Sequence, residues 1–296
     1  MGLRYKTVGI TARSDIADAE RTLQRIIRII ARSGATVLLD AKRCKHPALK
    51  KYRMYHRCRE LQLLVVLGGD GTILRTIREM DDLRVPLLSI NRGTIGFLAE
   101  MSLHEAENML PGFLRGQGQI EERSLLHITA MRGKKVLWEG RVLNEAVAAQ
   151  GAISRLIDLQ TSVNGDSLAT FHADGLIIAT PTGSTAYSLA AGGPIVHPQL
   201  SATILTPINP HSFNQKPIVL PAEDAIEVTI LTKPRKFTDI QVSLTLDGQT
   251  YVTLERNDTI RAVAAKETVK FLRRKEESFF TSLRSKLKWG ERPELT

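Results

Sequence analysis

The sequence LVVLGGDGT at residues 64–72 decides the fold expected of this chain. Its first half is an aliphatic run typical of a buried parallel strand, and the residues after it return to helical spacing. The glycines therefore lie at a strand-to-helix turn, where open α/β sheets bind ligands. Because glycine has no Cβ, a phosphate or ribose can approach such a turn closely and meet the N–H groups of the following helix.

Asp70 is the unusual residue in this turn, because a carboxylate repels the anions that the glycines favour. An acid has a use here if it binds a metal or accepts a proton from the attacking group of a substrate. The alternative is that Asp70 only caps the following helix. These residues alone leave both interpretations open.

Length and composition define the class of protein. The chain has 296 residues, of which 43% are hydrophobic, so it can bury a sizeable core and form two domains. It has no apolar run of the ~18 residues that a membrane span needs, and no signal-peptide segment at its start. We therefore expect a soluble, cytoplasmic protein without a membrane partner. Cys44 and Cys58 lie in a basic stretch without nearby metal-ligand residues and are expected to be exposed, reduced thiols.

The net charge of +10 could attract a polyanion or steer nucleotides toward a positive cleft. The basic residues are scattered, with local density only at residues 43–59 and 273–288. No basic stripe interleaved with aromatic residues occurs. We therefore expect solvated surface charge and no nucleic-acid partner.

The first part of the chain alternates strands and helices, which predicts a doubly wound, mostly parallel sheet. Ser14 and Asp15 are N-cap candidates for the first helix, and residues 47–59 are a weaker helix or a linker. The expected strands are residues 5–11, 35–39, 61–67 and 85–90, and the expected helices are residues 16–30, 73–80 and 103–114.

A second glycine-bearing turn, NRGTIGFL at residues 91–98, directly follows the fourth expected strand. Neighbouring parallel strands end at the same edge of a sheet, so this turn and the turn at residues 68–72 could share one ligand. Phe97 could cover a base or a nicotinamide there. The alternative is that Phe97 belongs to the core beside Leu98.

After residue 118 the pattern changes to short runs separated by Gly, Asn, Asp or Pro turns, which indicates a layered antiparallel β-sandwich. Residues 271–289 are expected to form an amphipathic helix that packs on the first domain, and residues 291–296 a frayed tail. The domains are thus residues 1–118, completed by 270–296, and residues 119–269. The expected strands are residues 126–131, 136–147, 153–163, 167–178, 218–220, 225–231, 240–246 and 251–254.

A second stretch with chemical groups is DGLIIATPTGSTAY at residues 174–187. After an acid and an apolar strand, it presents hydroxyls and small residues that could donate to phosphate or ribose oxygens, and Tyr187 can stack. Asn144 and Glu145 can donate and accept at once, as ribose hydroxyls or a carboxamide require. The plain alternatives are turn chemistry and a polar strand end.

Together these motifs resemble bacterial NAD kinases. The turn at residues 68–72 alone is a weak sign, because lipid kinases of the diacylglycerol and sphingosine type and phosphofructokinases carry similar turns. The long second stretch, combined with Asn144 and Glu145, is more specific. The matching segments are residues 68–72, 91–98, 143–145, 174–196 and 205–212.

The resemblance implies an active site between an α/β and a β domain, in a homodimer or homotetramer. It implies that the γ-phosphoryl group of ATP passes to the 2′-hydroxyl of the adenosine ribose of NAD, which yields NADP and ADP. A divalent metal, Mg²⁺ first, would assist, with no metal ligand assigned in the chain. Asp70 matches the general base. The positions matched to NAD binding are Asp70, Gly71, Arg75, Asn144, Glu145, Arg155, His172, Asp174, Thr185, Ala186, Tyr187, Ser188, Leu189, Ala190 and Gln249.

The chemistry agrees with this implication. A ribose hydroxyl does not ionise at neutral pH, so a carboxylate must take its proton as the new P–O bond forms. The chain departs from the commoner family pattern at Thr94, where a basic residue is frequent, and at Ala190, where Ser is frequent. Two alternatives are a lipid kinase, for which no membrane-docking face is evident, and a non-catalytic NAD(P) sensor, which would not need Asp70.

Overall fold

The computed structural model describes residues 2–12, 19–44, 49–91, 93, 96–151, 156–231, 242–275 and 279–290. It forms two compact units, Met1–Glu122 with Val269–Thr296, and Arg123–Thr268. In the part that is described, no helix is long and apolar enough to cross a membrane. Several sequence-based expectations fall outside the described residues, namely those for Ser14, Asp15, Thr94, Arg155 and residues 291–296.

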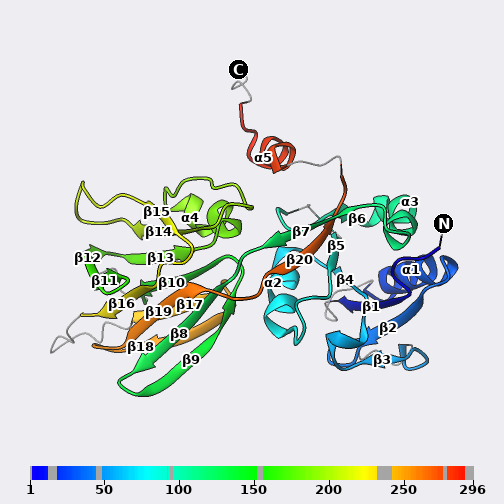
Figure 1. The fold of residues 1–296 in the computed structure, drawn as a ribbon, viewed down its shortest axis with the longest axis horizontal. Helices are drawn as coiled ribbons and strands as arrows, with labels where there is room; N and C mark the ends of the chain where they lie inside the picture. The colour runs from blue at the N-terminus through cyan, green and yellow to red at the C-terminus, as the bar shows by residue number, and fades with distance from the viewer. Residues whose placement is uncertain are drawn as a thin grey trace. The chain divides into compact units, whose positions relative to one another are not determined.

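The first unit is built on an eight-stranded sheet with the order β3-β2-β1-β4-β5-β20-β7, in which β6 pairs with β5 (Figure 1). The four predicted strands are parallel neighbours at its centre, as expected of a doubly wound sheet. They are β1 (Thr7–Ala12), β2 (Thr36–Asp40), β4 (Leu63–Leu67) and β5 (Leu87–Asn91), and the other strands are β3 (Met54–Tyr55), β6 (Met101–Ser102), β7 (Gln119–Arg123) and β20 (Val269–Arg273).

Three helices pack on this sheet. The helices α1 (Ala19–Arg32) and α3 (Leu103–Leu114) share one hydrophobic core with side chains from β1 and β4. The predicted bounds of α3 are confirmed, because Ser102 and Glu105 form a capping box at its start. Helix α2 (Asp70–Glu79) buries Ile73, Leu74 and Ile77. The described part of residues 47–59 holds β3 and the start of a 3₁₀ turn, η2 (Cys58–Glu60), but no α-helix.

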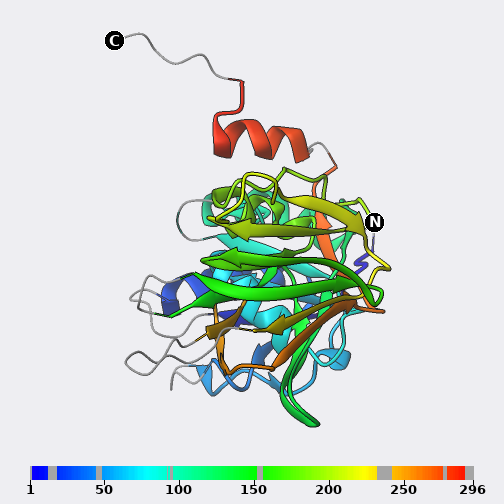
Figure 2. The same cartoon turned by 90° about the vertical axis from the view of Figure 1, so that its left-hand side faces the viewer.

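The second unit is a layered antiparallel β-sandwich, as the sequence predicts. Its two six-stranded sheets have the orders β15-β14-β13-β10-β17-β18 and β12-β11-β16-β19-β8-β9, and side chains from both form one core. Figure 2 shows the green and yellow strands of this unit running beside one another. The strands are β8 (Leu126–Arg132), β9 (Lys135–Val142), β10 (Glu145–Gln150), β11 (Ile157–Val163), β12 (Asp166–Ala173), β13 (Gly175–Ala179), β14 (Ala202–Ile208), β15 (Ile218–Pro221), β16 (Ile226–Ile230), β17 (Val242–Leu246), β18 (Thr250–Leu254) and β19 (Thr259–Ala264).

Several predicted elements were wrong in extent. The runs 136–147 and 167–178 are each two strands, because the chain passes from one sheet to the other at Leu143 and Asn144 and again at Asp174. The strands β14 and β19 were not predicted. Residues 271–273 belong to β20, which pairs with β5 in parallel, and not to a helix.

Ion pairs hold the end of β20 to the first unit. Glu100 is buried and accepts hydrogen bonds from Arg273 Nη1 at 3.1 Å and from Arg274 Nε at 3.0 Å. The last helix, α5 (Phe279–Leu287), contacts the same unit, since the Lys286 ammonium lies 5.2 Å from the centroid of the Phe97 ring. Of the predicted apolar side of α5, only Leu283 is buried.

Candidate functional site

Asp70 lies at the first position of α2, directly after the glycine turn that ends β4. The N-cap residue of α2 is Gly69, which has no side chain, and no side-chain hydrogen bond caps the helix. Instead, Asp70 Oδ2 accepts the backbone N–H of Phe97 at 2.9 Å and Oδ1 accepts that of Leu98 at 3.3 Å. The capping alternative for Asp70 is therefore wrong.

The second glycine turn closes over the same carboxylate. A Cβ atom at Gly96 would lie 2.2 Å from each Asp70 carboxylate oxygen, so a larger residue there would displace the carboxylate from this position. The two glycine turns thus meet around one half-buried acid, as expected for neighbouring parallel strands. Gly71 and Arg75, the other predicted site residues on α2, are exposed beyond it.

In the second unit, Asn144 and Glu145 lie where the chain crosses from β9 to β10. The Asn144 side chain is half-buried and has no hydrogen-bond partner among the described residues. Glu145 is 6% exposed, and its Oε2 atom is buried without a described partner. Burial, together with the neighbouring Asp247 carboxylate, raises the pKa of Glu145 from 4.5 to about 8.

This raised pKa predicts how the stability of the protein depends on pH. Between 4.5 and about 8 the folded protein keeps a proton on Glu145 that the unfolded chain loses, so stability decreases as pH rises through this range. Glu145→Gln cannot ionise, so we expect its stability relative to wild type to rise by a few kcal/mol across the same range, at about 1.4 kcal/mol per pKa unit. Urea unfolding at the two ends of the range gives the free energy of unfolding of each protein. If this free energy depended on pH equally in both proteins, the prediction would be contradicted.

Several hydroxyls in the run after β13 form hydrogen bonds within the protein. Ser184 Oγ donates to Pro181 O at 2.7 Å and accepts the Val196 N–H at 3.1 Å, and Ser188 Oγ lies 2.9 Å from Thr206 Oγ1. Both serines are buried, and their hydroxyls bond to groups of the protein itself. Small hydroxyl side chains satisfy the tight turns η3 (Thr182–Thr185) and α4 (Tyr187–Ala190).

Side chains of this segment that do reach the surface include Tyr187, which is 46% exposed, and Ala190. Thr185, Ala186 and Leu189 are half-buried. The segment lies against the strand crossing, because a Cβ atom added at Gly183 would lie 2.2 Å from Asn144 O and because the Tyr187 backbone N–H is near enough to the Glu145 carboxyl to oppose the rise in its pKa. The structure therefore brings Asn144, Glu145 and the 185–190 segment together.

Asp174 lies at the other end of the sheet that contains Glu145, and His172 lies in β12, which belongs to the other sheet of the unit. Glu145 is opposite Ala179 in the pairing of β10 with β13, whereas Asp174 precedes β13 and accepts a hydrogen bond from Gln150 Nε2 at 3.1 Å. A strand of five residues separates these ends by about 17 Å. His172 is exposed, with Nδ1 at 2.7 Å from Asp158 Oδ1. Gln249 is half-buried in the turn that joins β17 to β18.

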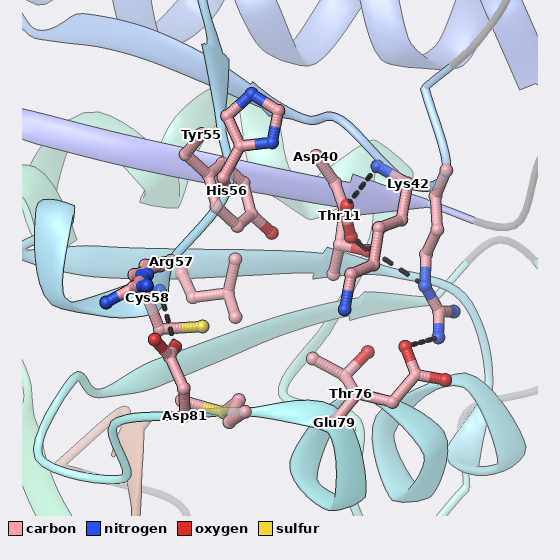
Figure 3. A pocket seen from close by; sticks show the side chains of 13 residues that line it. Thr11, Asp40, Lys42, Tyr55, His56, Arg57, Cys58, Thr76, Glu79 and Asp81 are labelled. Atoms are coloured by element: carbon pink, nitrogen blue, oxygen red, sulfur yellow. Dashed lines mark hydrogen bonds and ion pairs between the residues drawn. The ribbon is translucent and has the colours of Figure 1, made fainter.

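A separate polar cavity of about 260 Å³ lies in the first unit, beside α2 and the strands β1 to β3 (Figure 3). No predicted site residue lines it. Its carboxylates are paired within the protein, since Asp40 accepts the Thr11 hydroxyl at 2.7 Å and Glu79 accepts Arg43 Nη2 at 2.6 Å. We assign this cavity no role.

The cysteines correct another expectation. Both Cys44 and Cys58 are buried, not exposed, and Cys58 lines the cavity of Figure 3. Burial raises the pKa of Cys44 to about 11 and that of Cys58 to about 12. Their prediction as thiols without a disulfide is confirmed.

Comparison with known protein families bears on both units. The model of the ATP-NAD kinase N-terminal domain matches residues 8–118, and the model of the ATP-NAD kinase C-terminal domain matches residues 143–274. The chain belongs to the ATP-NAD kinase family. Asp70 falls within the N-terminal family domain, and Asn144, Glu145 and the 185–190 segment fall within the C-terminal one.

Curated members of the ATP-NAD kinase family match most of the chain. The NAD kinase of Citrifermentans bemidjiense is 38% identical over 291 residues, which cover 97% of this chain and all of that protein. The NAD kinase of Geotalea daltonii is 42% identical over 233 residues, or 79% of this chain and 80% of that protein.

Solved structures of the family share the fold. Yeast NADH kinase in complex with NADH has a TM-score of 0.84 at 23% identity and covers 98% of this chain and 89% of its own. An NAD kinase from Archaeoglobus fulgidus in complex with ATP has a TM-score of 0.72 at 24% identity and covers 94% of this chain and 99% of its own. The predicted α/β and β architecture is thus that of ATP-NAD kinases.

Sequence reasoning missed two residues beside the predicted site. Asp247 and Thr180 are buried and bond to the backbone around Asn144. In the sequence, Asp247 and Gly248 form an Asp-Gly pair typical of a turn, and Thr180 is one of the hydroxyl residues in the stretch at residues 174–187. A buried acid in a hairpin turn cannot be distinguished from an exposed one by the turn signal.

Proposed function

We propose that the chain is an NAD kinase, which transfers the γ-phosphoryl group of ATP to the 2′-hydroxyl of the adenosine ribose of NAD and releases NADP and ADP. Family membership supports this reaction. The single observation that carries the mechanism is Asp70, an acid held at a strand-to-helix turn by the N–H groups of a second glycine turn. The same family membership favours this function over a lipid kinase.

Asp70 acts as the general base in this proposal. Its two hydrogen bonds fix the direction of the carboxylate. The ribose 2′-hydroxyl gives its proton to Asp70 while its oxygen bonds to the γ-phosphorus, and the bond from that phosphorus to the bridging oxygen of ADP breaks. Proton transfer of this kind contributes about 10²- to 10⁴-fold to a rate.

A divalent metal, Mg²⁺ first, is the cofactor proposed for this reaction. Among the described residues, no three His, Cys, Asp or Glu side chains are grouped to hold a metal ion. Mg²⁺ is commonly bound through one or two carboxylates and substrate phosphates, so we propose that ATP carries it and assign no protein ligand. When bound, it neutralises charge on the triphosphate.

NAD is held in this proposal by groups of the second unit that have bonding capacity left. Asn144 has a free side-chain amide, and the buried Oε2 of Glu145 lacks a described partner. A protonated Glu145 can donate to an acceptor on the dinucleotide. Roles in NAD binding remain predictions for Gly71, Arg75, Arg155, His172, Asp174, Thr185, Ala186, Tyr187, Ser188, Leu189, Ala190 and Gln249.

Tyr187 offers a direct test of the segment it begins. Because Tyr187 is 46% exposed, Tyr187→Ala should change the unfolding temperature little. The loss of a stacking surface should raise the KM for NAD by about 3- to 10-fold, as a contact worth about 0.5–1.5 kcal/mol would. Steady-state kinetics measure this, and an unchanged KM would remove Tyr187 from the site.

The experiment that tests the function is incubation of the purified protein with ATP and Mg²⁺, offered either NAD or a diacylglycerol as acceptor. We expect NADP in the first reaction and no phosphorylated lipid in the second, and loss of product when a chelator removes the metal. Phosphorylation of the lipid alone would overturn the proposal. A cytoplasmic location, an assembly of two or four copies and the lack of a nucleic-acid or membrane partner remain predictions.

A further inference from the structure

We propose that Asp247 and Thr180 form a backbone clamp that positions Asn144 and Glu145 for NAD. The clamp is defined as these two residues and the three-residue segment Leu143 to Glu145 that they hold. The inference rests on the proposed function, because it matters for activity only if Asn144 and Glu145 contact NAD. Asp247 and Thr180 are positioning residues and are not proposed to touch the substrate.

The clamped segment lies where secondary structure cannot satisfy its backbone. Strand β9 ends at Val142 in one sheet, and β10 begins at Glu145 in the other. Leu143 and Asn144 therefore belong to no strand, although Leu143 is fully buried and Asn144 is half-buried. Buried N–H and C=O groups without partners are costly, so other groups must bond to this crossing.

Asp247 accepts all three N–H groups of the segment. Its Oδ2 lies 3.0 Å from the backbone N of Leu143, and its Oδ1 lies 2.8 Å from that of Asn144 and 3.2 Å from that of Glu145. Both carboxylate oxygens are used, and the side chain is 6% exposed. Hydrogen bonds of this kind, to an ionised acceptor, are about twice as strong as neutral ones.

The three carbonyls are satisfied by the same two residues. Thr180 Oγ1 donates to Leu143 O, and the Thr180 N–H donates to Asn144 O at 2.9 Å. The Asp247 N–H donates to Glu145 O at 3.0 Å. All six backbone groups of the segment are thus held by Asp247 and Thr180, which come from two different strand ends.

Turn chemistry explains how Asp247 reaches the segment but not why it must be an acid. Asp247 and Gly248 have φ angles of 48° and 63°, and the Gln249 N–H donates to Leu246 O at 3.0 Å. These features describe a type I′ hairpin turn, for which Asn-Gly is as suitable as Asp-Gly. Only a carboxylate, however, presents acceptors on both oxygens to three N–H groups.

In this segment, the backbone and the side chains therefore have different roles. The clamp uses the backbone of Leu143 to Glu145 completely and leaves the Asn144 amide and the Glu145 Oε2 atom available. Groups held in this way are preorganised, so a ligand need not order them on binding. Releasing the backbone should therefore weaken NAD binding before it affects the chemical step.

Asp247→Asn tests the carboxylate with the shape of the turn preserved. Its amide NH₂ would face the Leu143 N–H or the Asn144 N–H as a second donor, so at least one hydrogen bond of the clamp is lost. We expect the KM for NAD to rise about 10-fold or more, with kcat and the KM for ATP within about threefold of wild type. Hydrogen exchange at the amides of residues 143–145 should accelerate.

Thr180 provides an independent pair of variants. Thr180→Val removes the hydroxyl at nearly constant volume and should raise the KM for NAD about 10-fold, whereas Thr180→Ser keeps the hydroxyl and should recover most of this loss. Asp166→Asn is the matched control, because Asp166 is an exposed acid beside another hairpin turn of the same unit. Asp166→Asn should leave the KM for NAD and kcat unchanged.

Two outcomes separate the clamp from the proposed function, with Asn144→Ala as the reference. If Asn144→Ala raises the KM for NAD while Asp247→Asn and Thr180→Val do not, the clamp is refuted and the function stands. If all three leave NAD binding unchanged, Asn144 is not an NAD contact and both proposals fail at this site. Should Asp247→Asn not fold, the comparison of Thr180→Val with Thr180→Ser decides, and equal KM values for those two would overturn the clamp.

Discussion

Asp70→Asn is expected to lower kcat at least ~100-fold while NAD still binds. The amide cannot take a proton from the ribose hydroxyl, so the reaction loses its base. Substrate affinity should change much less, because the amide keeps the shape of the carboxylate and because Asn144 and Glu145, which are proposed to hold NAD, are unaltered. Turnover assays give kcat, and calorimetry with NAD alone gives the affinity.

A control on the same helix makes this result specific. Glu79→Gln also converts a carboxylate of α2 to an amide, and Glu79 bonds to Arg43 at 2.6 Å near the end of α2 away from Asp70. Its kcat should stay within about twofold of wild type, since surface substitutions away from a site have small effects. If Asp70→Asn turned over as fast as Glu79→Gln, Asp70 would not be the base.

Gly183→Ala is expected to have the second largest effect. A Cβ atom at position 183 would lie 2.2 Å from Asn144 O and 2.6 Å from the Asn144 carbonyl carbon, and both are backbone atoms that cannot rotate away. The crossing between β9 and β10 must then shift, at a cost of about 1–3 kcal/mol in stability. We expect a lower unfolding temperature and a KM for NAD raised at least ~10-fold.

Gly133→Ala is the control for a general glycine effect. Gly133 has a φ of 55° in the turn between β8 and β9, and no atom lies within 4 Å of a Cβ atom added there. This variant should lose stability through backbone strain alone, with an unchanged KM for NAD. A KM that rises equally in both variants would show that Gly183 acts only through stability.

The parts of the fold predicted from sequence are those where local signals agree. The strand and turn at residues 64–72 and the helix at residues 103–114 were predicted with nearly correct boundaries, and the structure has β4, α2 and α3 there. The β-sandwich followed from short runs between turn residues. The prediction of a helix at residues 271–273 was wrong, because these residues pair with β5 and this pairing overrides their helical pattern. No local signal in the sequence reveals such a pairing.

Residue types in the site were predictable, but their partners were not. The sequence identifies Asp70, Asn144 and Glu145 as polar groups at strand ends. It does not reveal that Phe97 and Leu98 donate to Asp70 through their backbones, or that Asp247 bonds to three successive N–H groups. Such contacts join residues far apart in the chain, and a backbone donor leaves no trace in residue type.

A crystal structure of the chain with NAD and a non-hydrolysable ATP analogue tests the mechanism most directly. The distance to measure is that from the Asp70 carboxylate to the 2′-oxygen of the adenosine ribose. A general base must lie within about 2.6–3.2 Å of that oxygen or be linked to it by one water. We predict such a contact. A carboxylate remote from the ribose, with no bridging water, would contradict the assignment of Asp70 as the base.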